Sequence, residues 1–271
     1  MAVEIRHFLD LLETIAPAAL AETWDNPGLQ VGNPTATVNH VLVALDPTLS
    51  AVRAAAKADA QVLFTHHPLI FRPISRVDAT SFPGNVIFEA FKGRLSILSA
   101  HTNLDSAQGG INDMLAELLG LENVSVLSPV DASAQAGLGR VGDLPAPASL
   151  GRFAREVGRH LGIDNLKRVG DKNRRIHRVA VVGGSGGSLV MCAHEVGADL
   201  LLTGDVGHHA ALEAASLGLA LLDGGHFRTE KAAFTLFAEK LAERCAAEGW
   251  SIEFSVYEDE ADPMTWEMGD G

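Results

Sequence analysis

The first half of the chain alternates short apolar runs with stretches in which apolar residues recur every three to four positions. The runs predict buried strands and the periodic stretches predict amphipathic helices. The predicted strands are 40–45, 61–65 and 95–100, and the predicted helices are 5–16, 48–57, 85–92 and 111–119. A single short helix between two strands is typical of a right-handed βαβ unit with parallel strands. The pattern therefore predicts an α/β fold.

The second half repeats this pattern. Residues 177–182, a helix and residues 197–203 match residues 40–45, a helix and residues 58–65, over almost the same number of residues. The repetition predicts two similar α/β lobes from an internal duplication, with mixed, largely parallel sheets and flanking helices. We assign residues 1–126 together with 226–271 to the first lobe, and residues 127–225 to the second lobe.

Other segments lack so clear a period. Residues 22–32 combine turn-forming residues with a tryptophan, which predicts a structured loop. Residues 137–147 are rich in Gly, Pro and Ala, which indicates a boundary or hinge. A long helix is expected from Thr229, its N-cap, to Cys245, followed by a last strand at 251–256. We expect the acidic segment after Tyr257 to be disordered.

Composition narrows the range of functions. The formal net charge is −13 and Lys and Arg form no extended run, which argues against nucleic-acid binding, since phosphates are neutralised by clustered cations. The two cysteines fall in helical patterns and are interpreted as small core residues of a reducing compartment. No apolar run approaches about eighteen residues, and no signal peptide is visible, so we expect no membrane span and a cytoplasmic location.

Candidate chemistry lies at the carboxyl ends of three predicted strands. His66 and His67 follow the run 61–65, and open α/β sheets bind ligands at that edge. Two solvated histidines in a turn are an equally good interpretation of this pair alone. The strand at 95–100 also ends in a histidine with an acid four residues later, His101 and Asp105.

A third strand, 219–223, is followed by His226 and Glu230 with the same spacing. If the three strands belong to one parallel sheet, their ends form one rim. That rim would carry His66, His67, His101, Asp105, His226 and Glu230. Imidazole and carboxylate ligands without thiolates suit zinc, iron or manganese, and a mixed set of this size suits a two-metal hydrolytic site.

Three other features allow two interpretations each. The run from Gly183 to Gly187 is either a tight strand-to-helix turn or an amide cradle for an anion. His208 and His209 open a predicted helix, either as ordinary helix residues or as contacts to a substrate. Trp24 and Asp25 either line the pocket or anchor the first loop, and the anchoring interpretation is favoured.

The motifs together resemble those of one family. Thr65-His66-His67-Pro68, His101-Thr102-Asn103-Leu104-Asp105 and His226-Phe227-Arg228-Thr229-Glu230 are similar to motifs of the interacting-factor-three-like family, whose members are labelled type 2 homologues of GTP cyclohydrolase I. The segments 24–29, 139–145, 183–187 and 203–205 resemble its other landmarks in the expected order. The resemblance covers nearly the whole chain.

This resemblance implies a dinuclear centre of divalent transition metals. Its ligands would be His66, His67, Asp105, His226 and Glu230, with His101 as a sixth. It also implies two α/β lobes and a toroidal homohexamer built as a trimer of dimers. The chain is too short between 144 and 178 for the inserted domain that some members carry.

Three hypotheses for function follow. The leading one is metal-dependent hydrolysis of a purine nucleotide, with GTP cyclohydrolase activity as its concrete version and His101 or His209 as the proton shuttle. The second is phosphoester hydrolysis by the same metals, ranked lower because Arg72, Arg76 and Arg228 are the few cations available for phosphate. The third is a non-catalytic metal-binding or regulatory ring protein.

Overall fold

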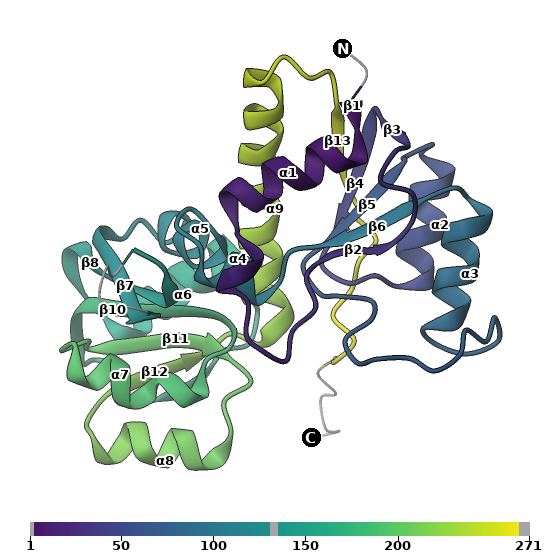
Figure 1. Cartoon of the computed structure of the whole chain (residues 1–271). Helices are drawn as coiled ribbons and strands as arrows, with labels where there is room; N and C mark the ends of the chain where they lie inside the picture. The colour runs from purple at the N-terminus through teal and green to yellow at the C-terminus, as the bar shows by residue number, and fades with distance from the viewer. Residues whose placement is uncertain (1–2, 131–134, 266–271) are drawn as a thin grey trace.

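The structure, a computed structural model, describes residues 3–130 and 135–265 and contains two main sheets with flanking helices (Figure 1). In the first sheet four strands are parallel and β2 is antiparallel at one edge. Its strands are, in spatial order, β13 (Glu253–Val256), β4 (His40–Ala44), β5 (Val62–Thr65), β6 (Ser96–Ser99) and β2 (Gly28–Val31). Every residue of β5 and β6 is buried, as expected for central strands covered on both faces.

The second sheet has six strands, of which β10, β11 and β12 are parallel. The spatial order is β7 (Glu122–Pro129), β8 (Gly137–Ser149), β10 (Arg175–Ser185), β11 (Leu200–Gly204), β12 (Ala220–Asp223) and β9 (Lys167–Val169). The short strands β1 (Val3–Glu4) and β3 (Thr37–Val38) form a separate antiparallel pair. The prediction of a mixed α/β fold is confirmed: the first sheet is largely parallel, whereas three of the five strand pairings of the second sheet are antiparallel.

Helices cover both faces of each sheet. The outer faces are covered by α2 (Leu49–Lys57) and α3 (Gly84–Lys92) on the first sheet, and by α7 (Val190–Glu195) and α8 (His208–Ser216) on the second. One continuous apolar core contains the inner faces of both sheets and the helices between them. These are α1 (Ile5–Ile15), α5 (Ile111–Leu118), α6 (Leu150–Leu161) and α9 (His226–Ala247), with the short elements η1 (Ala18–Leu20) and α4 (Thr102–Ser106) nearby. The short helix η2 (Gly187–Leu189) lies with α7 and α8 on the outer face of the second sheet.

The long helix α9 links the two sheets. It begins three residues after β12 of the second sheet and runs between the two sheets (Figure 1). Its apolar stripe packs on the first sheet, where the rings of Phe234 and Phe237 lie 5.1 and 6.5 Å from that of Phe64 in β5. Helix α9 thereby brings the strand ends of both sheets to one place.

Within the described residues, no helix combines the length and apolarity needed to cross a membrane.

The two sheets also repeat a local arrangement. The side-chain oxygen of Gln61 accepts hydrogen bonds from two backbone N–H groups at the start of β4, and the Asp199 carboxylate does the same at β10. The helix that precedes each of these residues ends in a left-handed turn, at Asp59 and at Gly197. These matching contacts support the predicted duplication, which stays a prediction together with the boundaries proposed for the two lobes.

Two segments predicted as irregular are strands. Within 22–32, residues 28–31 form β2, which pairs antiparallel with β6 and is short enough to be hidden among turn formers. The segment 137–147 is no hinge, because it belongs to β8, paired with both β7 and β10. Its glycines permit close strand contact, since a Cβ on Gly137 would lie 2.2 Å from a backbone oxygen of β7. Its prolines at 145 and 147 lie beyond the pairing with β7, where a missing N–H is tolerated.

Two predictions at the C-terminal end are also corrected. Helix α9 begins at His226 rather than after Thr229, whose hydroxyl donates to the Gly225 and His226 carbonyls instead of capping the helix. The segment after Tyr257 is ordered through residue 265, and residues 266–271 lie outside the described residues. The Glu260 carboxylate accepts hydrogen bonds from two backbone N–H groups after β4, at 2.9 and 2.7 Å, and pairs with Lys231.

Candidate metal centre

The three predicted strand ends meet, although the strands do not share a sheet. Strands β5 and β6 belong to the first sheet and β12 to the second, so the condition of one common sheet is not met. The ends converge because α9 starts directly after β12 and leads into the first sheet's core. All six predicted metal ligands reach this junction, namely His66, His67, His101, Asp105, His226 and Glu230.

The Glu230 carboxylate lies at the middle of this cluster. Its Oε2 is 3.1 Å from His67 Nε2 and 3.1 Å from His226 Nε2, while its Oε1 is 3.7 Å from His66 Nε2. His66 Nε2 is also 3.5 Å from Asp105 Oδ1. Two sets of side chains, His66 with His67 and His101, and His67 with His226 and Glu230, place one ligand atom each within 4.8 Å of the others. His67 belongs to both sets.

Every histidine of the cluster is held from behind by an oxygen atom at Nδ1. His66 contacts the Ala100 carbonyl at 2.8 Å, His67 the Asp46 carboxylate at 2.8 Å, His101 the Asp25 carboxylate at 2.8 Å, and His226 the Asp205 carboxylate at 2.7 Å. An oxygen partner at Nδ1 fixes the orientation of a histidine and leaves Nε2 free to bind. This arrangement is typical of the second layer of a metal site.

The start of α9 places His226 and Glu230 together. Residues four apart lie on one face of a helix, which explains the spacing seen in the sequence. Glu230 is also fixed by the glycine run, because a Cβ on Gly184 would lie 2.0 Å from its Oε1. Gly184 has φ +63° and donates its N–H to the Thr229 hydroxyl. The run thus forms a turn that packs against the candidate ligand itself.

Three buried atoms of the cluster make no hydrogen bond of good geometry among the described residues, although one of them, Glu230 Oε2, lies 3.1 Å from two imidazole nitrogens. They are His66 Nε2, Asp105 Oδ1 and Glu230 Oε2. His66 and Glu230 are 0% and 3% exposed, and an unpaired buried polar atom costs about 1–3 kcal/mol. A cation between these atoms would satisfy all three at once. The donor set of imidazoles and carboxylates therefore fits a divalent transition metal.

The charges of the cluster are strongly coupled. Burial alone would raise the pKa of Glu230, but the surrounding histidines hold it well below its usual value. Burial raises the pKa of the Asp105 carboxyl. The adjacent Glu230 carboxylate raises the pKa of His226 to about 9, and Asp46 and Glu230 overcome the burial of His67 and raise its pKa to about 10. Without a metal, protonated His67 and His226 thus supply the positive charge that balances the Glu230 carboxylate.

The sequence did not identify all parts of the centre. Asp46 lies two residues after β4, as His67 lies two residues after β5, so its place after an apolar run is the available signal. Asp205 lies in the segment 203–205, whose sequence resembles a family landmark but does not itself indicate a contact with His226. His209, predicted as a proton shuttle, lies exposed in the first turn of α8, 5.9 Å from the His208 ring and outside the residues that line the cavity. Its catalytic role stays a prediction.

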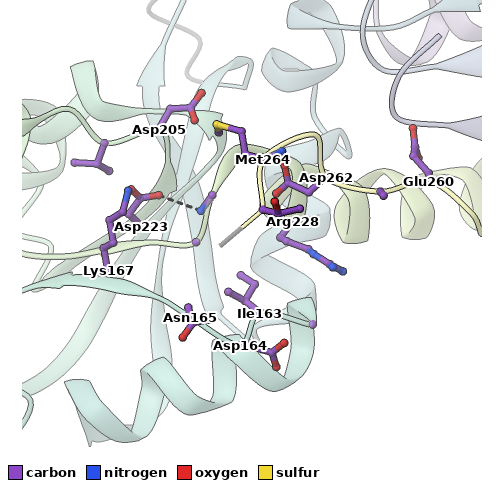
Figure 2. A pocket seen from close by; sticks show the side chains of 16 residues that line it. Ile163, Asp164, Asn165, Lys167, Asp205, Asp223, Arg228, Glu260, Asp262 and Met264 are labelled. Atoms are coloured by element: carbon purple, nitrogen blue, oxygen red, sulfur yellow. Dashed lines mark hydrogen bonds and ion pairs between the residues drawn. The ribbon is translucent and has the colours of Figure 1, made fainter. Parts of the chain in front are cut away.

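A cavity of about 780 Å³ opens onto the cluster, within the range of small-molecule sites. Its walls come from both sheets and include Trp24, Phe71, His101, Asp105 and Glu230. Behind the Asp205 carboxylate lies a second cavity of about 610 Å³ (Figure 2), with Asp223 and Lys167 on one side and the segment 260–265 on the other. The first cavity is the one that reaches the candidate ligands.

Fold and site together define the class of this protein. It is an α/β protein with a candidate metal centre of histidines and carboxylates at the junction of two sheets. The chain belongs to the Duf34/NIF3 (NGG1p interacting factor 3) family, whose model matches residues 3–263. The resemblance inferred from the motifs is therefore confirmed.

Relatives cover nearly the full length of the chain. It is 36% identical over 264 residues to a protein of Clostridium perfringens named GTP cyclohydrolase 1 type 2 homolog, with 97% of this chain and 99% of that one covered. A protein of the same name from Streptomyces coelicolor is 38% identical, with 94% and 91% covered. The crystal structure of a Bacillus cereus protein related to NIF3 superposes with a TM-score of 0.92 at 26% identity, covering 98% of this chain and all of that one.

Proposed function

We propose that this protein is a hydrolase that uses two divalent transition-metal ions per chain, zinc, iron or manganese, to open the purine ring of a nucleotide. The concrete version is hydrolysis of GTP with loss of C8 as formate. The observation that carries the proposal is the pair of three-residue sets that share His67 and enclose unpaired buried atoms. The names of the relatives favour GTP as the first substrate to test.

Each residue of the centre has a defined task in this proposal. His66, His67, Asp105, His226 and Glu230 would hold the two metal ions, each histidine through Nε2, with His101 as a sixth ligand where it does not transfer a proton. When bound, such ions act as Lewis acids and supply a water nucleophile at neutral pH. Asp25, Asp46 and Asp205 fix the imidazole rings through Nδ1.

Proton transfer is assigned to His101 in this scheme. Asp25 holds its Nδ1, so only Nε2 can transfer a proton, and His101, which lines the cavity, takes this role where it is not the sixth metal ligand. His209 stays the alternative shuttle, and it would have to reach the substrate from outside the cavity wall. No Lys or Arg occurs among the described residues that line the cavity, which favours attack on a ring over attack on a phosphate group.

The test measures formate released from GTP by protein stripped of metal and reloaded with zinc, manganese or iron(II). We expect release by the loaded wild type and loss of at least about a hundredfold in Glu230→Gln. Glu239→Gln, an exposed position on the same helix, is the matched control and should behave as the wild type. Loaded protein that releases no formate would refute the cyclohydrolase proposal and favour a non-catalytic metal-binding ring.

We further propose that the chain assembles as a toroidal homohexamer, a trimer of dimers with the metal centres facing its interior. The family resemblance is the support for this assembly. Native mass spectrometry separates six copies from the single 28.6 kDa chain. A species that stays monomeric at micromolar concentration would contradict the proposal.

A further inference from the structure

Three large aromatic side chains stand exposed at the wall of the metal-centre cavity. Trp24, Phe71 and Phe82 are 54%, 45% and 67% exposed, and all three line that cavity. Single exposed apolar residues are common on protein surfaces. Three aromatic rings around one cavity that leads to a candidate metal centre indicate a surface made to contact a ligand.

The loop that carries Trp24 is fixed to the centre. The side chain of Asp25 accepts hydrogen bonds from the backbone N–H of Thr102 at 3.0 Å and from its hydroxyl at 2.5 Å, and it holds His101 Nδ1 at 2.8 Å. The Glu22 N–H donates to the Thr102 hydroxyl at 2.9 Å. The predicted anchoring role thus belongs to Asp25. Trp24, next to this anchor, keeps more than half of its surface exposed.

A second set of contacts fixes Phe71 relative to Trp24. The Asn26 side chain donates to the Ile70 carbonyl at 2.8 Å, and the Ile70 N–H donates to the Gln30 side chain at 3.1 Å. The rings of Trp24 and Phe71 lie 5.5 Å apart, and both approach the His101 ring, at 6.0 and 6.3 Å. Aromatic faces held in place before binding lose little entropy when a ring stacks on them.

The charge of the cavity restricts what can stack there. Its lining is more apolar than polar, and its ionisable groups among the described residues are Glu22, Asp105, Glu230 and the histidines, without Lys or Arg. A polyphosphate would meet no compensating side-chain cation of the wall. A planar, uncharged ring with nitrogen and oxygen atoms at its edge matches both the aromatic wall and the histidines at its end.

We propose that Trp24 and Phe71 form a stacking platform that binds an uncharged heteroaromatic ring, a nucleobase, and points its edge toward the metal centre. This inference rests on the proposed function for the identity of the site, and it assigns the base as the recognised part of the substrate. A phosphate chain attached to the ring would remain at the open side of the cavity.

The experiment measures binding of guanosine, and of ribose as the probe without a base, to zinc-loaded protein by isothermal titration calorimetry. Trp24→Leu keeps apolar bulk and removes the aromatic face, whereas Trp24→Phe keeps a face. We expect Trp24→Leu to weaken guanosine binding by about 5- to 150-fold, the equivalent of the ~1–3 kcal/mol of one base–aromatic stack. Trp24→Phe should stay within about threefold of the wild type. Ribose should not bind.

Phe88→Leu, which removes an exposed aromatic ring on α3, is the matched control and should leave guanosine binding unchanged. Zinc content is measured for every variant. Equal guanosine binding by Trp24→Leu and Trp24→Phe would overturn the platform, as would a wild type that binds no guanosine. Loss of zinc from Trp24→Leu alone would also overturn it, because Trp24 would then be a structural part of the centre.

The two proposals fail separately. Trp24-dependent guanosine binding without formate release from GTP would refute the hydrolase and leave the platform intact. Formate release with an unchanged KM for GTP in Trp24→Leu would refute the platform and leave the hydrolase intact.

Discussion

Replacing Gly184 by alanine tests whether the glycine run serves the metal centre. The backbone at Gly184 has φ +63°, so any side chain there costs about 1–2 kcal/mol. The new Cβ would also lie 2.0 Å from Glu230 Oε1 and 3.3 Å from His226 Cε1. Since ordinary contact begins near 3.4 Å, the carboxylate would have to move by roughly 1.4 Å. A ligand displaced by that distance no longer binds the same metal ion.

Gly197→Ala is the matched control, because Gly197 has φ +74° and a Cβ there would meet nothing within 4 Å. Urea denaturation should show a loss of about 1 kcal/mol or more in the free energy of unfolding for both variants. Competition with a zinc chelator should show a loss of affinity of at least about 10- to 100-fold in Gly184→Ala alone. Equal zinc affinity in the two variants would refute the assigned role of Gly184.

Three further outcomes are expected. Asp46→Asn should lower zinc affinity by about 10- to 100-fold, because the partner of His67 Nδ1 changes. Asp10→Asn, on the exposed face of α1, is the control and should keep the wild-type affinity, and equal zinc affinities in the two variants would contradict the role of Asp46. Glu260→Ala should lower the free energy of unfolding by roughly 2–3 kcal/mol in urea, because two backbone N–H groups lose a charged acceptor; a loss below about 0.5 kcal/mol would argue against this anchor. Burial raises the pKa of the Cys245 thiol to about 11, so little thiolate exists at pH 8. At that pH iodoacetamide should label half-buried Cys192, as detected by peptide mass spectrometry, and rapid labelling of Cys245 would contradict its burial.

The candidate ligands that the structure brings together could be predicted because they depend on local patterns. An apolar run that ends in a histidine identifies the carboxyl end of a strand, and an acid four residues later lies on the same helical face. Both patterns are local in the sequence. In the structure, His101 precedes the short helix that contains Asp105, and His226 and Glu230 lie in the first turns of α9. The α/β class followed from the same apolar periodicity.

Features that depend on distant contacts could not be predicted. The contact of Asp46 with His67 and that of Asp205 with His226 join residues 21 positions apart, and many surface aspartates share their sequence context. The assignment of β12 to the second sheet depends on strand pairing, which periodicity does not specify. The glycines of the segment 137–147 led to the prediction of a boundary or hinge, whereas the segment is a strand. Glycine is favoured both at flexible boundaries and where two strands pack closely, so its presence does not distinguish them.

The central claim is that distant parts of the chain bind a pair of metal ions together. Elemental analysis of chelator-stripped protein, reloaded with zinc and freed of excess by dialysis, tests it directly. We predict two equivalents of zinc per wild-type chain and fewer than one in Glu230→Ala, whose carboxylate belongs to the central contacts. Wild-type protein that retains no zinc, or a Glu230→Ala variant that retains the full two equivalents, would contradict the account.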